Sequence, residues 1–363
     1  EKQDLTDDIK PLLGSSGGGN KNLIINGAMQ CAQYGSSSTS SGFYTVDRFQ
    51  LNFTGTNEAP TQAQAALTSS DTPYNSGFRF SYKVTNGNQT GGGGAAKFIR
   101  FKTTIEAQDI AQSGWNYTSS SSNVTLSFWV KASVAQTYYG RLQTEDGTAR
   151  NYPFSFALSA NTWTKVTKTI PGNTSPTLQF DNNNGAGLIL EIVPYYGTDY
   201  TGSMSLDAWA TYSDRTPDNT ATWYTTNDAT FEITGVQLEV SSVATDFEHI
   251  SFADELRRCQ RYYQVVAEGA NHIIGSVFTV SSYIYSVVDL LVTMRATPTI
   301  EVSNFSNAFR AYGTGGGVNV NTLTITAESR NNRVLIEQSG NPGTVASLRC
   351  YDANSKLAFT AEL

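Results

Sequence analysis

The chain has 363 residues, a formal net charge of −7 and only 15% charged residues, where roughly 25% is usual for soluble proteins. An acidic chain repels the phosphates of nucleic acid, and the sequence holds no run of about 18 apolar residues, so we predict neither nucleic-acid binding nor a membrane span. Aromatic residues make up 12% of the chain, and Gly, Ser, Thr and Asn are abundant. This composition favours many short strands joined by tight turns.

Residues 1–20 are polar and mostly acidic, and they end in the run SSGGG. Such a composition is typical of a tether rather than of a packed core. We predict an N-terminal docking segment here, which a partner protein would order.

Residues 21–248 carry the alternation of apolar and polar side chains that marks half-buried strands. The clearest examples are FRFSYKV at 78–84, VTLSFWVKAS at 124–133, GLILEIVPYY at 187–196 and VQLEV at 236–240. Turn-forming runs rich in Gly, Asn, Pro and Ser separate them. The fold class predicted is all-β, with one large antiparallel jelly-roll β-sandwich in this region.

Residues 249–267 break this pattern and predict a connecting helix over 251–266. Ser251 and Asp254 form a variant of the capping box that starts helices. Apolar residues then recur at steps of four and three, as on the seam of a coiled coil. The predicted seam consists of Phe252, Leu256, Cys259, Tyr263 and Val266. It packs either on the chain's own sandwiches or on the same helix of neighbouring copies, and the pattern leaves both open.

Residues 268–363 return to short alternating segments and predict a second, smaller C-terminal β-sandwich. The segments lie at 275–294, 321–329, 333–340, 347–353 and 356–363.

Signals for a metal site or for nucleophilic catalysis are weak. The chain has two histidines, His249 and His272, and no GxSxG motif. Cys31, Cys259 and Cys350 are widely spaced and lack a CxxC pair, so we predict reduced thiols and no zinc. Asp181 begins the run DNNNG, which offers oxygen ligands of the kind that a structural calcium ion uses but is equally a good tight turn.

Carboxylates are the one remaining catalytic possibility, because glycoside hydrolysis needs a pair that meets in space. Candidates are Glu191, Asp199, Glu232 and Glu239. Nothing in their spacing ties them together, and we predict a protein that is not an enzyme.

Aromatic side chains in predicted loops suggest contacts with sugars, which stack on flat rings while neighbouring polar groups bind the hydroxyls. The glycan-contact candidates are Tyr195, Tyr196, Tyr200, Trp209, Trp223 and Tyr224. Tyr138 and Tyr139, expected just after a strand, belong to the same class. The competing interpretation is that these rings cover the ends of the sandwich.

Several motifs together resemble a family of bacteriophage tail-fibre and virion proteins that carry a carbohydrate-binding-like jelly roll. The matching segments run from NLIINGAMQ at 22–30 and YTVDRFQ at 44–50, through LSFWVKAS at 126–133 and NTWTKVTKTIPG at 161–172, to FEITGVQLEVSSVATDFEHISFADELRRCQRYYQV at 231–265. The last is the most specific, with QLE, ATDFE and ELRRCQRYY in the family's order. The chain departs from the family's pattern at CAQYG after the Met and at Phe49 after the Arg.

The resemblance implies a non-enzymatic virion structural protein, usually trimeric, located in the phage tail or fibre. It implies that the partners are other copies of the chain and, through residues 1–20, other virion proteins, with a host-surface glycan as the expected ligand. A purely structural capsid or tail decoration protein shares the same motifs. A polysaccharide depolymerase is the third hypothesis, supported only by scattered carboxylates.

Overall fold

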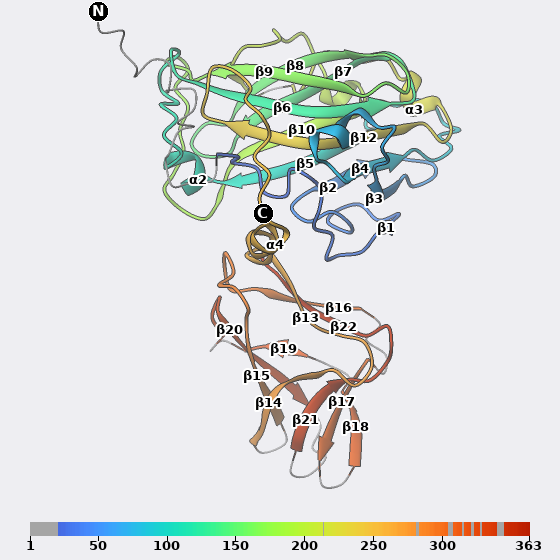
Figure 1. Cartoon of the computed structure of the whole chain (residues 1–363), viewed down its shortest axis with the longest axis vertical. Coiled ribbons are helices and arrows are strands. Elements are labelled where there is room, and N and C mark those ends of the chain that lie inside the picture. The colour runs from blue at the N-terminus through green and yellow to red at the C-terminus, as the bar shows by residue number, and fades with distance from the viewer. Residues whose placement is uncertain are drawn as a thin grey trace, which may run out of the picture.

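The computed structural model describes residues 21–212, 214–280, 283–303, 308–313, 316–320, 323–326, 329–339 and 345–363. The predicted tether, residues 1–20, lies outside the described residues. An N-terminal sandwich and a C-terminal sandwich lie end to end, with helix α4 between them (Figure 1). The chain's C-terminus returns to this joint.

The N-terminal sandwich consists of two six-stranded antiparallel sheets. Sheet I has the order β1-β3-β4-β12-β6-β9 and contains β1 (Ser37–Ser38), β3 (Thr61–Ala66), β4 (Phe80–Thr85), β12 (Thr230–Glu239), β6 (Asn123–Ala132) and β9 (Thr164–Pro171). Sheet II has the order β11-β8-β7-β10-β5-β2 and contains β11 (Ala210–Thr211), β8 (Arg150–Leu158), β7 (Gln136–Thr144), β10 (Ala186–Tyr196), β5 (Phe98–Glu106) and β2 (Gln50–Thr54). Most successive strands cross from one sheet to the other, and the predicted jelly-roll sandwich is confirmed.

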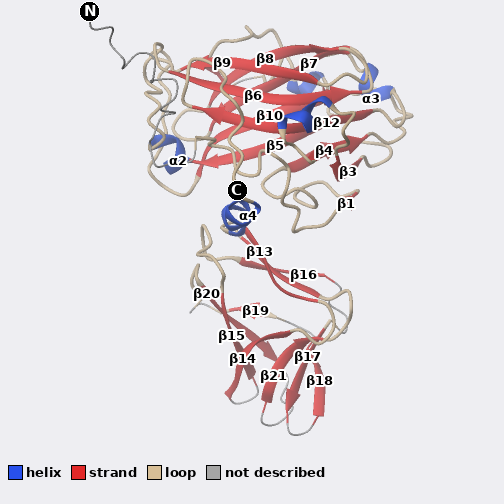
Figure 2. Cartoon of the chain, in the orientation of Figure 1, coloured by secondary structure: helices blue, strands red, loops and turns tan. Residues whose placement is uncertain are grey.

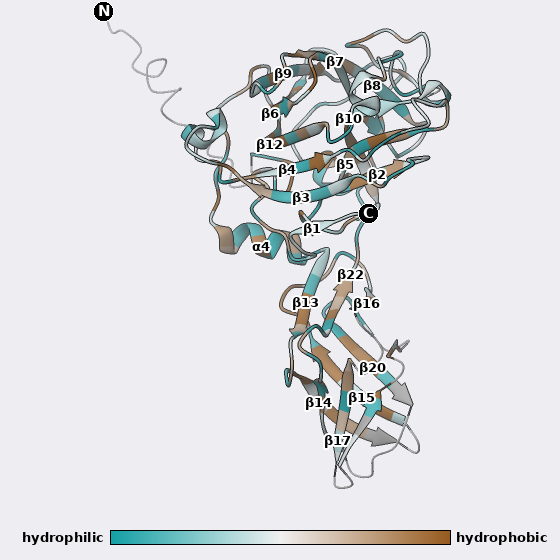
Figure 3. Ribbon diagram, turned by 90° about the vertical axis from the view of Figure 1, so that its right-hand side faces the viewer, coloured by the Kyte–Doolittle hydropathy of each residue, from teal (hydrophilic) through white to brown (hydrophobic). Residues whose placement is uncertain are grey.

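The core of this sandwich lies between the two sheets and is filled by alternate residues of each strand. On β6 the inward side chains include Val124, Leu126 and Phe128, and on β10 they include Leu188 and Leu190. Polar and apolar residues alternate along many strands of both sandwiches (Figure 3). The period of two predicted from the sequence is therefore confirmed on these strands.

The helices that the structure describes are short (Figure 2). In addition to α4, the described residues form the helices α2 (Ala107–Ala111) and α3 (Thr222–Thr225) and the 3₁₀ turns η1 (Thr72–Ser76) and η2 (Thr198–Tyr200). Within the described residues, no helix combines the length and the apolar character needed to cross a bilayer.

The C-terminal sandwich has a core of its own, built around residues such as Phe309, Ile336, Leu348 and Phe359. Its smaller sheet, β13-β22-β16, contains β13 (Tyr263–Glu268), β22 (Lys356–Thr360) and β16 (Thr299–Ser303). Its larger sheet, β18-β17-β21-β14-β15-β20-β19, contains β18 (Gly316–Val320), β17 (Phe309–Gly313), β21 (Val345–Cys350), β14 (Ile273–Val280), β15 (Tyr283–Asp289), β20 (Arg333–Ser339) and β19 (Thr324–Ile325). The predicted all-β fold with a smaller second sandwich is confirmed.

Helix α4 spans Phe252–Gln260 and begins as the sequence predicts. The Ser251 Oγ accepts a hydrogen bond from the Asp254 backbone N–H at 3.2 Å, which satisfies a donor that the first helical turn leaves open. The predicted C-terminal end is wrong, however, because β13 starts at Tyr263 and pairs with β22 from there on. Tertiary strand pairing has overridden the local helical pattern.

The shorter helix also divides the predicted seam. Tyr263 and Val266 belong to strand β13, so only Phe252, Leu256 and Cys259 lie on α4. The Phe252 side chain is 55% exposed and Leu256 is half-buried, whereas Cys259 is buried within its own chain. The five residues therefore do not form one continuous helical stripe.

The joint between the sandwiches is held by aromatic and ionic contacts from both sides. The Tyr34 ring stacks on Tyr263 with centroids 3.7 Å apart, and the Arg48 guanidinium pairs with the Glu362 carboxylate. The Arg48 guanidinium also lies 3.4 Å from the centre of the Tyr262 ring. Segments from opposite ends of the chain are thus packed together where α4 enters.

Candidate functional site

The aromatic residues predicted to contact a glycan lie mostly inside the N-terminal sandwich. Trp223 and Tyr224, on α3, are fully buried, and Tyr195, Tyr196 and Trp209 are each at most 9% exposed. Only Tyr200 is half-buried. The five buried rings cover sandwich ends and sheet faces, so they do not form the exposed stacking surface expected from the sequence. A direct sugar contact by this set stays a prediction.

The reason for this burial is visible in their partners. The Tyr195 and Tyr224 rings pack with centroids 4.5 Å apart, and the Trp223 indole N–H donates to the Thr230 carbonyl at 3.0 Å. Large rings of this kind bury much apolar area, and their polar atoms find partners where they are covered. In this region the competing interpretation, covering the sandwich, fits the geometry better.

Sheet II has a second face, which points away from the core and carries polar and charged side chains. Its strand registers align Gln50 on β2, Lys102 on β5, Glu191 on β10 and Arg141 on β7 in one row across four strands. Successive side chains of a strand point to opposite faces, and the neighbours of Glu191 on β10, Leu190 and Ile192, belong to the core. The row therefore lies on the outer face of the sheet.

Glu191 is the centre of this row and is only 1% exposed. Its carboxylate accepts hydrogen bonds from Arg141 Nε at 2.6 Å and from the Tyr196 hydroxyl at 2.5 Å, and pairs with Arg100 Nη1 at 2.7 Å. Burial by itself would raise the pKa of the Glu191 carboxyl, but Arg141 and Arg100 outweigh it and lower the pKa to about 2. The carboxylate is held ionised by its neighbours.

Lys102 and Tyr139 are the less constrained side chains of the same face. Both are half-buried, and the described residues give neither the Lys102 ammonium nor the Tyr139 side chain a hydrogen bond, ion pair or ring contact. Burial, followed by the neighbouring Arg100, lowers the pKa of Lys102. In addition, the Arg100 Nε atom is buried with no hydrogen-bond partner among the described residues. The Lys102 ammonium and the Tyr139 ring are thus the two partly accessible groups of this face that have no partner among the described residues.

Residues 197–212 and 214–220, which include η2 and β11, form a covering loop beside this face. The Arg215 guanidinium lies 4.8 Å from the Tyr200 ring centre and donates to the Tyr196 hydroxyl at 3.3 Å. The Asn151 amide, which belongs to the outer face of β8, fixes the loop by donating to the Arg215 carbonyl at 2.8 Å. The loop therefore adds a fourth cation beside Arg100, Lys102 and Arg141.

The sequence predicts which side chain of β10 lies on this outer face, but it does not predict which residues of other strands lie next to it. GLILEIVPYY predicts that Glu191 lies opposite the core residues of its strand, which is confirmed. The partners Lys102 and Arg141 are far from it in sequence, and only the strand register brings them together. Tyr139, expected after a strand, lies inside β7.

The scattered carboxylates considered for glycoside hydrolysis do not gather at one place. Glu191 lies on sheet II, whereas Glu232 and Glu239 lie on β12 of sheet I. Glu232 pairs with Lys131 at 3.3 Å, and Glu239 pairs with Lys21 at 3.5 Å. Asp199 lies in the exposed turn η2. These residues do not form the close pair that the reaction uses.

A hollow of about 300 Å³ lies near the start of α4 and is lined by both apolar and polar residues. Its lining includes Phe78, Phe247, His249 and the exposed Phe252. The His249 ring packs 5.1 Å from Phe78 and 4.9 Å from Phe247, and its Nε2 lies 2.8 Å from the Ser76 carbonyl oxygen. The His249 side chain is exposed, and these contacts hold its ring against Phe78 and Phe247 at the surface.

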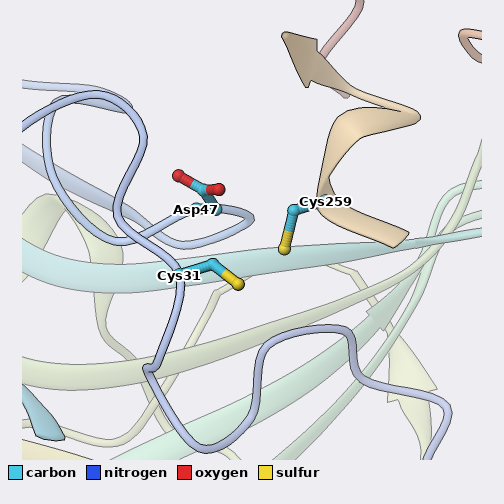
Figure 4. A group of neighbouring side chains, drawn as sticks. All are labelled: Cys31, Asp47 and Cys259. Atoms are coloured by element: carbon cyan, nitrogen blue, oxygen red, sulfur yellow. The ribbon is translucent and has the colours of Figure 1, made fainter. Parts of the chain in front are cut away.

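Cys31, Asp47 and Cys259 form a buried group at the joint (Figure 4). Two come from the segment before β2 and the third from α4, and their ligand atoms lie within 4.8 Å of one another. Burial raises the pKa of the Cys259 thiol, and its contact with Cys31 raises it further. Burial also raises the pKa of Asp47 to about 7, although both carboxylate oxygens accept hydrogen bonds from Gln33 at 2.7 Å.

This group fits a zinc ion only in part. Structural zinc sites are almost always completed by four ligands, and no further His, Cys, Asp or Glu among the described residues joins these three. The Asp47 oxygens already accept hydrogen bonds from Gln33, and burial raises the pKa of the Cys259 thiol, which disfavours the thiolate that binds zinc. We therefore treat the group as packing at the joint. The wide sequence spacing of the cysteines gave no hint of this meeting.

The run Asp181–Asn184, weighed for calcium, is an exposed turn. The Asn183 side-chain oxygen accepts a hydrogen bond from the Gly185 N–H at 2.7 Å, and the Asp181 N–H donates to Asp146 at 2.9 Å. Calcium binding here stays a prediction.

Among the comparisons with known proteins, only the comparison with solved structures gives matches. No family model matches the chain, and no curated protein matches it either. Consequently the resemblance to phage tail-fibre proteins stays a prediction from sequence motifs.

Among solved structures, a family 4 carbohydrate-binding module is 12% identical, with 60% of this chain and 99% of that chain covered and a TM-score of 0.29. A putative sugar-binding protein from Bacteroides thetaiotaomicron is 13% identical, covering 61% of this chain and all of its own, with a TM-score of 0.31. A family 11 module from Clostridium thermocellum, solved with a β-1,3-1,4-linked tetrasaccharide, is 8% identical over 58% of this chain and 98% of its own, with a TM-score of 0.28. At these values the similarities carry no information about a ligand.

Proposed function

We propose that this chain is a glycan-binding protein without catalytic activity, and that it acts as a tail-fibre or tail-attached protein of a bacteriophage. The observation that carries the glycan-binding proposal is the outer face of sheet II. It combines ordered hydrogen-bond donors with the half-buried Tyr139 ring. Sugar recognition needs both, because a ring covers the apolar face of the sugar while fixed polar groups select its hydroxyls.

Burying charged side chains on this face costs desolvation free energy, which supports a role for the face other than stabilising the fold. Glu191 and Arg141 are both buried, and two desolvated charges often contribute no net stability compared with apolar residues of similar size. Such a pair does fix its neighbours in place, and here it orients Arg100 and the Tyr196 hydroxyl. Preorganised donors lower the entropy lost on binding.

Glycan binding is tested with the purified full chain on a microarray of bacterial surface polysaccharides. We expect binding to at least one glycan, and a loss of at least about tenfold in affinity for Tyr139→Ala, since stacking is removed. Tyr283→Ala is the matched control, because Tyr283 is an exposed tyrosine of the C-terminal sandwich. Equal binding by both variants and the parent would show that Tyr139 is not a contact.

The phage assignment rests on the motifs at 22–50 and 231–265, and the trimer rests on the same resemblance. The exposed Phe252 and half-buried Leu256 leave an apolar edge of α4 open to a neighbouring copy. Sedimentation equilibrium at micromolar concentration should give three times the chain mass of 39.3 kDa. A stable monomer would contradict the trimer.

The location of the chain on the phage particle distinguishes a tail-fibre protein from a purely structural decoration protein. Immunogold labelling of intact phage should place this chain at the tail, with residues 1–20 required for attachment. Label on the capsid surface, together with no glycan binding, would instead identify a decoration protein. Release of reducing ends from host polysaccharide would revive the depolymerase hypothesis.

A further inference from the structure

The outer face of sheet II has a charge opposite to that of the whole chain. Arg100, Lys102 and Arg141 rise from its strands, and Arg215 lies over it from the covering loop. The carboxylates that act on Lys102 are Glu191 and Glu145. The face therefore carries a positive surplus in a chain whose net charge is −7.

The positive surplus is not neutralised inside the protein. Both oxygens of Glu191 are occupied, one by Arg100 and the other by Arg141 and the Tyr196 hydroxyl. Glu145 accepts a hydrogen bond from Gln143. Consequently the Lys102 ammonium has no ion pair among the described residues, although Glu191 stands directly opposite it in the strand register.

Resting on the glycan-binding function proposed above, we propose that the outer face of sheet II selects acidic glycans, with the sugar carboxylate of a uronic or sialic acid paired to Lys102. The Lys102 ammonium, which has no ion pair among the described residues, supplies the donors for that carboxylate. Neighbouring strands lie roughly 5 Å apart, so Tyr139, two strands away from Lys102 along the same face, would stack on a second sugar of the chain. The ligand is accordingly an oligosaccharide.

Charge complementarity gives the proposal its specificity. A carboxylate would relieve the repulsion between Lys102 and Arg100 that a neutral sugar leaves in place. Nucleic acid is the other polyanion to consider, but the surrounding surface of an acidic chain repels a long phosphate backbone. A short cationic row flanked by an aromatic ring fits spaced carboxylates on a sugar chain better.

The experiment measures affinity by calorimetry for matched acidic and neutral probes. These are polygalacturonate and its methyl ester, and a sialylated oligosaccharide and its asialo form. We expect at least about tenfold tighter binding of the acidic member of one pair at low ionic strength, a difference that falls as NaCl screens the charges. Lys102→Met should lower the affinity for the acidic member to that of its neutral partner, so that the preference is lost.

Lys165→Met is the matched control, because Lys165 is an exposed lysine on β9 of sheet I. Circular dichroism and thermal melting confirm that both variants are folded. If Lys165→Met lowers the acidic preference as much as Lys102→Met does, the effect is one of net charge and the proposal is wrong.

The outcomes separate this inference from the proposed function. Equal affinity for acidic and neutral members overturns the acidic preference but leaves glycan binding intact. Binding to none of the four probes, nor to the polysaccharide microarray, overturns both. Tighter binding of single-stranded DNA than of any glycan also overturns the inference, because it assigns the cationic face to phosphates.

Discussion

Two regions of the molecule bury carboxylates, and they treat the negative charge in opposite ways. On the outer face of sheet II, Glu191 is surrounded by arginines and its pKa falls to about 2. At the joint, Asp47 lies beside two thiols and its pKa rises to about 7. The difference teaches that burial alone does not set the charge of a carboxyl, because the neighbours decide which form is favoured.

This contrast matches different tasks. The face of sheet II keeps charges ionised and in surplus, which is costly for stability but suits recognition of an anion. At the joint, burial raises the pKa of the Cys259 thiol and so favours its neutral form, and Arg261 is paired with Glu106 at 2.8 Å. Neutral and paired groups suit a permanent contact between two domains.

The largest effect should come from breaking the ion cluster of the face. Glu191→Gln leaves Arg141 and Arg100 buried without their counter-charge, and we expect a loss of about 4 kcal/mol in the free energy of unfolding. Urea denaturation at pH 7 measures it. The exposed Glu145→Gln is the control and should change stability by less than about 0.5 kcal/mol. Equal, small losses in both variants would contradict the ion cluster.

The pH dependence of stability should sharpen the contrast between the two carboxyls. The Asp47 pKa is raised in the folded state from 3.8 to about 7, so its stabilising contribution is complete below pH 3.8 and is lost as pH rises toward 7. The Glu191 pKa is lowered from 4.5 to about 2, so its contribution is present above pH 4.5 and is lost as pH falls toward 2.

Asp47→Asn removes the titratable group at the joint and with it the Asp47 contribution to the pH dependence of stability. From the raised pKa, we expect it to abolish up to about 4 kcal/mol of the stability change between pH 4 and pH 7. Urea denaturation across this range is the measurement. A slope identical to that of the parent would mean that Asp47 is not the group that titrates.

A smaller effect is expected from the thiol contact at the joint. Cys259→Ala deletes one buried sulfur atom and should cost about 1 to 2 kcal/mol. The control on the same helix is Arg257→Ala, whose side chain is 72% exposed and should change stability by less than about 0.5 kcal/mol. Should the two variants melt at the same temperature, Cys259 would not be packed as described.

Lys102→Met should give the smallest change in stability. Burial and Arg100 disfavour the ammonium form of Lys102, so its replacement should leave stability unchanged or raise it by a few tenths of a kcal/mol. The same variant should lose the preference for acidic glycans. A destabilisation above about 1 kcal/mol in thermal melts would show that Lys102 has a structural partner.

Local patterns in the sequence determined the strands and the helix start. The alternation in VTLSFWVKAS gives β6 and its buried Val124, Leu126 and Phe128, because a strand exposes successive side chains to opposite faces. Ser251 and Asp254 mark the beginning of α4, since helix capping depends on residues only three positions apart.

Tertiary structure alone decided where the helix stops, which rings are covered and which charges meet. Pairing of Tyr263 with Thr360 ends the helical pattern, and packing of Tyr224 on Tyr195 hides two expected sugar contacts. Lys102, Arg141 and Glu191 share a row only through the order and register of β5, β10 and β7. These features depend on contacts between residues distant in sequence, which no local period encodes.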